Sequence, residues 1–283
     1  MAFNVTFKDL LESGVHFGSP ASRWCPKMKQ YIHSENNNLH IINLRETLKG
    51  LIRACHYLEK LASTGRKVLF IGTKRQASEI VRQEAQRCNS YFVVHRWLGG
   101  TLTNMTTMRK RMARLNELES LETSGQIENF SKKMIANLGR EKKKIFRNFE
   151  GIRDMDGVPG AMVIVDPNAE ANAVAEAVKL DIPLIALTDT DTDPSMIDFV
   201  IPGNDDSQRS IQIIMAALAD AVAEGNKKAG NMAAIAQREK EAAAPAGRER
   251  GGRRPRRGGE AAKDVAVPEN LSEMGAFTMP DDE

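Results

Sequence analysis

The chain has 283 residues, 41% of them hydrophobic and 5% aromatic, and a formal net charge of only +3. This length suggests one large domain or two modest ones with a mostly aliphatic core. The three cysteines, Cys25, Cys55 and Cys88, are far apart, which argues against a disulfide framework or a zinc ribbon and favours a reducing compartment. Since there is no apolar signal segment and no run approaching the roughly 18 apolar residues of a membrane helix, we expect a soluble, cytoplasmic protein.

A segment near the N-terminus, residues 23–31, alternates basic and aromatic side chains. Basic side chains can hold phosphates while aromatic rings stack on unpaired bases. The segment is therefore a candidate contact to a single strand or a loop of RNA. The candidate residues are Arg23, Trp24, Lys27 and Lys29.

Five short apolar runs predict buried strands, at residues 67–71, 91–94, 161–165, 183–187 and 198–201. They are continuous rather than alternating, which is typical of a parallel sheet covered on both faces. Helices are predicted at residues 44–62, 73–88, 169–180 and 207–224. This alternation indicates an open α/β domain with right-handed crossovers that cover both faces of the sheet.

The first predicted strand ends in a glycine turn that leads into a helix, with Thr73 as a possible cap before Lys74 and Arg75. Cations in the first turn of a helix are disfavoured by the helix dipole, unless a phosphate binds there. The turn carries no nucleotide-binding fingerprint. It is therefore either a solvated helix start or a contact to a phosphate of RNA.

A second candidate contact is the segment RWLGGTLTN, residues 96–104, which follows the second predicted strand. Arg96 and Trp97 can stack on bases or pair with phosphate. Thr101 and Asn104 offer short hydrogen-bonding groups for phosphate or the ribose 2′-hydroxyl. An equally good interpretation is a tight turn with a buried Trp97.

Residues 105–149 are far longer than one crossover and predict two helices, 105–122 and 128–148. Their apolar positions repeat as in a coiled coil, so we expect an antiparallel helical hairpin inserted into the α/β domain. The hairpin has eleven basic and five acidic residues, a net charge of +6. This excess predicts a stripe that follows phosphates, with Arg109, Lys110 and Arg111 as candidate RNA contacts.

Carboxylates follow the last predicted strands: Asp166 after the third, Asp189 and Asp191 after the fourth, and Asp205 after the fifth. Three of them, Asp189, Asp191 and Asp205, are a candidate site for a structural divalent cation such as Mg²⁺. Capping of turns and helices is the interpretation we favour. A metal-dependent transfer enzyme would also need a base, a nucleophile or an oxyanion-stabilising group. No such set is apparent, so we predict that the protein is not an enzyme.

The composition changes after Gly225, where Ala, Gly, Arg, Glu and Pro dominate. Such a segment cannot bury enough apolar surface to fold alone. We predict an α/β domain of residues 1–104 and 150–225, an inserted hairpin of residues 105–149, and a flexible low-complexity tail of residues 226–283. Four arginines of the tail can bind RNA without sequence preference: Arg253, Arg254, Arg256 and Arg257.

Six stretches together resemble the bacterial small-subunit ribosomal protein S2 family, from about Phe7 to Glu224: GVHFG, RWCPKMKQYI, LHIINLRETL, VLFIGTKRQAS, HRWLGGTLTN and DFVIPGNDDS. The resemblance implies a flavodoxin-like, three-layer fold with a parallel sheet of order 2-1-3-4-5 and the inserted helical hairpin. In one departure, the family commonly has a histidine after GVHFG, where this chain has Ser19.

The resemblance also implies a structural constituent of the small ribosomal subunit in the cytoplasm, with no required cofactor and no homo-oligomer. It implies binding to small-subunit rRNA between head and body, contacts with neighbouring subunit proteins, and a role in docking ribosomal protein S1. By position, Arg23, Lys27 and Lys29 match the family's basic N-terminal segment. Lys74 and Arg75 match its GTKR turn, and Arg96, Trp97 and Asn104 match its RWLGG…LTN loop.

Overall fold

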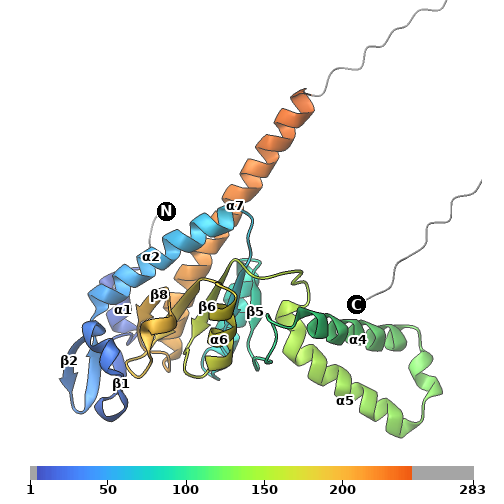
Figure 1. The fold of residues 1–283 in the computed structure, drawn as a ribbon, viewed down its shortest axis with the longest axis horizontal. Coiled ribbons are helices and arrows are strands. Elements are labelled where there is room, and N and C mark those ends of the chain that lie inside the picture. The colour runs from blue at the N-terminus through green and yellow to red at the C-terminus, as the bar shows by residue number, and fades with distance from the viewer. Residues whose placement is uncertain (1–4, 244–283) are drawn as a thin grey trace, which may run out of the picture. The chain divides into compact units, whose positions relative to one another are not determined.

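A parallel sheet of five strands forms the centre of the protein, in a computed structural model that describes residues 5–243 (Figure 1). The strand order is β5-β4-β6-β7-β8. The strands are β4 (Val68–Ile71), β5 (Tyr91–Val93), β6 (Ala161–Val165), β7 (Leu184–Thr188) and β8 (Phe199–Pro202). All residues of β4, β6 and β7 are buried, as their continuous apolar runs predict. The predicted α/β class with a parallel sheet is confirmed.

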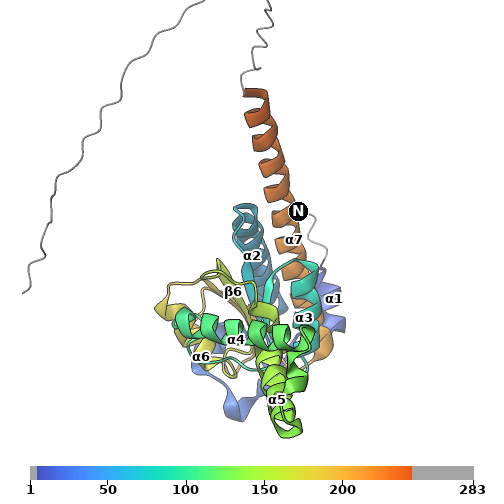
Figure 2. The same cartoon turned by 90° about the vertical axis from the view of Figure 1, so that its right-hand side faces the viewer.

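Successive residues of each strand point to opposite faces of the sheet, and each face has its own apolar core. Val68 and Phe70 pack into one core with α2 (Leu44–Ser63), α3 (Ser78–Arg87) and α7 (Gln208–Ala243). Leu69 and Ile71 pack into the other with α6 (Ala171–Lys179) and the base of the helical hairpin. In Figure 2, β6 lies between α6 on one side and α3 and α7 on the other.

The N-terminal part contains elements that the sequence did not predict. These are α1 (Phe7–Glu12) and an antiparallel sheet of order β1-β3-β2, made of β1 (Phe17–Pro20), β2 (Ile32–Asn36) and β3 (Leu39–Ile42). The candidate RNA segment lies between β1 and β2 in two short 3₁₀ helices, Ala21–Arg23 and Pro26–Tyr31. Asn37 and Asn38 both have positive φ, as a tight hairpin turn requires.

The predicted inserted helices correspond to α4 (Met105–Thr123) and α5 (Lys132–Phe149), which pack against each other (Figure 1). Gly125, with φ +72°, follows the end of α4, and the 3₁₀ helix Gln126–Asn129 connects the two. The second helix begins at Lys132 rather than at residue 128. The cause is Ser131, whose hydroxyl accepts a hydrogen bond from the backbone N–H of Met134 and caps α5.

The last helix is longer than the predicted one of residues 207–224, because α7 continues to Ala243 and residues 226–243 are helical. Gly225, which looks like a boundary in the sequence, lies against α2, where a Cβ would be 2.5 Å from Ala62 Cβ. Just beyond it, Lys228 pairs with Glu59 of α2. Residues 244–283, which include Arg253, Arg254, Arg256 and Arg257, lie outside the described residues. No helix in the described part of the chain is long and apolar enough to cross a membrane.

Candidate nucleic-acid interface

The loop of residues 96–104 is organised around a carboxylate that the sequence does not reveal, Glu176 of α6. Oε1 of Glu176 accepts hydrogen bonds from Trp97 Nε1 at 2.9 Å and from the backbone N–H of Gly100 at 2.7 Å. Oε2 accepts from the backbone N–H groups of Leu102 and Thr103, at 3.0 and 3.1 Å, and from the Thr103 hydroxyl. The hydrogen-bond donors on the inner side of this loop are therefore already bound to the Glu176 carboxylate and not available to RNA.

The charge of Glu176 is maintained by these contacts. Burial raises the pKa of Glu176, but the hydrogen bonds from Trp97, Gly100, Leu102 and Thr103 outweigh it and hold the pKa below its usual value. Nothing in the sequence of α6 marks this residue, because Glu176 resembles any polar position of an amphipathic helix.

The two interpretations of this loop apply to different residues. Trp97 and Thr101 are 6% and 2% exposed, and the Thr101 hydroxyl donates to the carbonyl of Leu98 at 2.5 Å. These two residues are structural. Arg96 and Asn104 are exposed. The Asn104 side chain caps α4 by accepting from the backbone N–H of Thr107 at 3.4 Å, so Arg96 is the side chain of this loop best placed to meet a partner.

Lys74, a candidate phosphate contact, is neutralised within the fold. Its ammonium lies 2.7 Å from Asp166, 2.8 Å from Asp205 and 3.0 Å from Asp206. Burial disfavours the charged form of Lys74, but its hydrogen bonds to Asp166 and Asp205 raise its pKa well above the usual range. Its neighbour Arg75 is exposed. Of the pair, only Arg75 presents its charge outward.

The carboxylates after the strands act as caps and ion-pair partners. Asp189 accepts from the backbone N–H and the hydroxyl of Ser19, both at 2.9 Å. Asp166 accepts from the backbone N–H of Asn168 at 3.0 Å. The Asp166 contact caps a local turn, as the capping interpretation expects, whereas Asp189 binds a residue of the N-terminal segment. Burial raises the pKa of Asp189, and raises that of Asp205 to about 7 against the hydrogen bond from Lys74.

The structure does not bring Asp189, Asp191 and Asp205 together as a set of metal ligands. Asp191 is exposed, and Asp205 faces the Lys74 ammonium. Among the side chains that the structure describes, no group of three or more His, Cys, Asp or Glu residues is placed to hold a metal ion. The cation beside these carboxylates is Lys74 itself, which follows the first strand at the same edge of the sheet.

The candidate RNA contacts near the N-terminus differ in whether their side chains are already bound within the protein. Lys27 pairs with Asp193 at 2.7 Å and donates to the Ser195 hydroxyl at 2.8 Å. This contact raises the pKa of Lys27 and lowers that of Asp193 to about 2. The half-buried Trp24 ring lies 5.3 Å from the His40 ring. Arg23 and Lys29 are the exposed candidates that remain.

The hairpin carries eleven basic and five acidic residues. Arg109, Lys110 and Arg111 are exposed, and Arg109 donates to the carbonyl of Asp156 at 2.9 Å. The fold also brings Arg96 beside α5, across 47 residues of sequence, in a hollow of about 480 Å³. This hollow, named the basic hollow below, is lined by His95, Arg96, Lys143, Lys144, Arg147 and Asn148. Burial and the nearby Arg147 and Arg82 lower the pKa of His95.

Comparison with known proteins identifies the family of the chain. The family model described as ribosomal protein S2 matches residues 10–225. The small ribosomal subunit protein uS2 of Rhodopirellula baltica is 52% identical over 222 residues, which cover 78% of this chain and 85% of that protein. On the strength of this match, over a region that includes the whole sheet and the hairpin, the chain belongs to the ribosomal protein S2 family.

Proposed function

We propose that the chain is a structural constituent of the small ribosomal subunit that binds small-subunit rRNA through Arg96 and the basic face of α4 and α5. Ribosomal protein S2 is a structural protein, so the chain is not an enzyme. This basic surface lies on a single inserted hairpin, which is an arrangement suited to a protein that holds neighbouring RNA segments in place.

The observation that carries the proposal is the uncompensated charge of the basic hollow. Arg96, Lys143, Lys144 and Arg147 form no ion pair with any other side chain described in the structure. By contrast, Lys27 and Lys74 face carboxylates of the protein. Unpaired cations gathered in a concave surface attract phosphates, and the RNA releases its bound counterions when those phosphates are neutralised. The hollow is therefore suited to an RNA backbone.

The family relationship supports further parts of the proposal. They are a position between the head and body of the subunit in the cytoplasmic ribosome, contacts with neighbouring subunit proteins, and help in docking ribosomal protein S1. The exposed Arg23 and Lys29 at the small sheet supply a second basic contact. We propose no required cofactor, since Lys74 supplies the positive charge among the strand-end carboxylates.

Binding of the full chain to small-subunit rRNA at several salt concentrations tests the proposal. We expect Arg96→Ala and Arg147→Ala each to weaken binding and to reduce the slope of log K against log salt by about 0.7–0.9. Arg114→Ala is the control on the same hairpin, because Arg114 pairs with Glu117 and Glu141, and its slope should stay close to that of the unmodified chain. Unchanged slopes in both test variants would contradict the proposal.

A further inference from the structure

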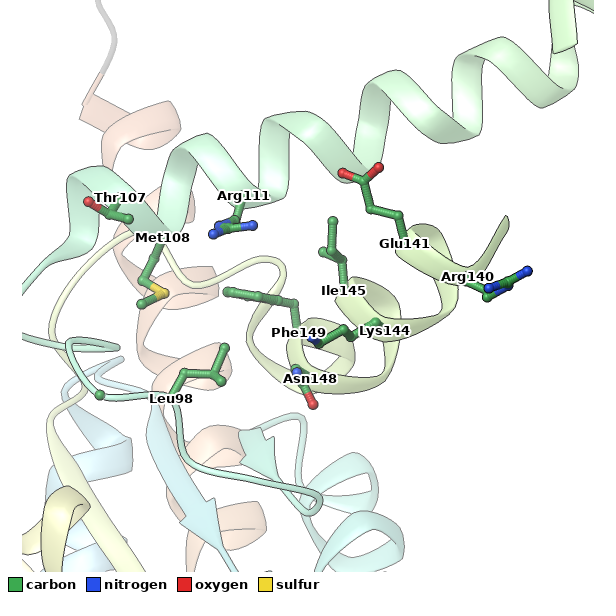
Figure 3. A pocket seen from close by; sticks show the side chains of 11 residues that line it. Leu98, Thr107, Met108, Arg111, Arg140, Glu141, Lys144, Ile145, Asn148 and Phe149 are labelled. Atoms are coloured by element: carbon green, nitrogen blue, oxygen red, sulfur yellow. The ribbon is translucent and has the colours of Figure 1, made fainter. Parts of the chain in front are cut away.

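A second cavity, of about 740 Å³, adjoins the basic hollow between the loop that contains Leu98 and the two hairpin helices (Figure 3). Its floor is apolar. Leu98, Met108, Ile145 and Phe149 converge on it from the loop, from α4 and from α5 (Figure 3). The volume is within the range of pockets that enclose small organic groups. We call it the hairpin cavity.

The edge of the hairpin cavity is basic. Arg111, Arg140 and Lys144 line it and are exposed, and none of them pairs with a carboxylate in the part of the chain that the structure describes. Glu141 also lines the cavity, but it accepts a hydrogen bond from Arg114 at 3.3 Å. An apolar floor is therefore surrounded by free positive charge.

We propose that the hairpin cavity takes the base of one unpaired rRNA nucleotide, whose flanking phosphates lie on Arg111, Arg140 and the basic hollow. The inference rests on the proposed function and deepens it. An unstacked base has a flat, largely apolar face. Moving this face from water onto the apolar floor of the cavity is favourable because both surfaces are then removed from water. Thr107 and Asn148, which also line the cavity, offer a hydroxyl and an amide to the hydrogen-bonding edge of the base.

We favour RNA over an acidic peptide because the hairpin cavity lies directly beside the basic hollow. Lys144 and Asn148 line both of them, so an apolar cavity and a cation-lined hollow follow each other directly. A nucleic-acid strand has the same alternation of base and phosphate along its length. The net charge of +6 on the hairpin also matches a polyanion.

Gly99 provides a direct test because it lines the cavity, is exposed, and would meet nothing within 4 Å if given a Cβ. Gly99→Leu therefore adds an apolar side chain to the cavity lining at a position where a Cβ meets no neighbouring atom. Gly157→Leu is the matched control, since Gly157 is also open to solvent and lies outside the cavity lining. Full-length proteins are bound to small-subunit rRNA and mapped by base-specific chemical modification and by hydroxyl-radical cleavage of the backbone.

The unmodified chain and Gly157→Leu should protect one unpaired base that Gly99→Leu leaves reactive, while the backbone footprint persists in all three. Affinity of Gly99→Leu should fall about 10-fold. Lys144→Ala, as a second variant that leaves the cavity floor intact, should weaken binding and reduce the salt slope. Base protection and affinity unchanged in Gly99→Leu would overturn the inference but leave the proposed function standing. An unmodified chain without any footprint would overturn both.

A photocrosslinking side chain at position 99, in assembled small subunits, identifies the occupant directly. The expected product is an adduct with a single rRNA nucleotide. An adduct with a protein segment, or no adduct in subunits that contain the chain, would overturn the inference.

Discussion

Lys74 shows how the meaning of one side chain depends on the groups that the fold brings to it. At the start of a helix, a lysine is typical of a site for an external anion. Here three carboxylates from two other strand ends surround it, and Lys74 becomes an internal cation that joins β4 to the loops after β6 and β8. Breaking such a pair leaves buried carboxylates without compensation, which costs more than an exposed ion pair contributes.

We expect Lys74→Met to lower the free energy of unfolding by roughly 3 kcal/mol at neutral pH. The loss should be smaller near pH 5. The folded pKa of Asp205, already raised from 3.8 to about 7 by burial, rises further without Lys74. The folded state then binds more protons than the unfolded chain, so stability falls as the pH rises from about 4 to above 7.

Urea unfolding at pH 5 and pH 7.5 measures this effect. The control is Arg75→Met, which removes an exposed charge next to Lys74 and should change stability by less than about 0.5 kcal/mol. A Lys74→Met variant as stable as the control at pH 7.5 would argue against the internal cation.

Glu176 holds the loop of residues 96–104 in its folded form, so we expect Glu176→Gln to destabilise the protein by about 2 kcal/mol. The amide N–H₂ of glutamine cannot accept the hydrogen bonds that one carboxylate oxygen now accepts. Fluorescence of Trp97, in a Trp24→Phe background, should change together with stability. Glu79→Gln, at an exposed position of α3, should leave both unchanged; an equal effect of the two variants contradicts the assignment.

At the scale of elements, the hairpin depends on a narrow apolar contact between its helices. Leu115 of α4 is only 1% exposed and belongs to the core shared by the hairpin base and one face of the sheet. We expect Leu115→Ala to cost roughly 3 kcal/mol and to speed amide hydrogen exchange in α4 and α5 more than in β6 and β7. Met134→Ala, at a position 47% exposed, is the control; similar exchange in both variants would show that Leu115 does not hold the helices together.

The elements differ in how far the sequence predicts them. The strands of the large sheet lie within one residue of the predicted runs, because full burial requires continuous apolar residues. The small sheet has no such pattern: β2 is almost entirely exposed, and its pairing with β3 depends on a turn at Asn37 and Asn38. The end of α7 is not evident from the sequence, because the composition of its last turns resembles that of the tail, whereas contacts with α2 continue beyond Gly225.

At the scale of the whole molecule, the N-terminal segment is joined to the large sheet rather than extending freely. Ser19 donates twice to Asp189 after β7, and the backbone N–H of Cys25 donates to the carbonyl of Thr190 at 2.8 Å. The RNA candidates Arg23 and Lys29 are thereby held at a fixed position beside the carboxyl ends of the strands, which lowers the entropy lost on binding a partner.

Removing residues 244–283 tests the contribution of the tail to the whole molecule. Because the tail's composition cannot support a core, a chain that ends at Ala243 should keep the thermal midpoint of the full chain. Its affinity for RNA should fall by a similar factor for every RNA sequence, since Arg253, Arg254, Arg256 and Arg257 are lost with the rest of the tail. A lower midpoint contradicts the first expectation, and unchanged binding contradicts the second.

The sequence by itself determined the α/β class, the buried strands, the two inserted helices and the basic character of the hairpin, because burial and charge leave local patterns in a chain. The tertiary structure alone decided which charges are free. Lys74 meets Asp166 across 92 residues and Trp97 meets Glu176 across 79, while Arg96 joins Lys143 and Arg147 in one hollow. Whether a charge is neutralised depends on groups within a few ångströms of it, and sequence spacing does not report such distances.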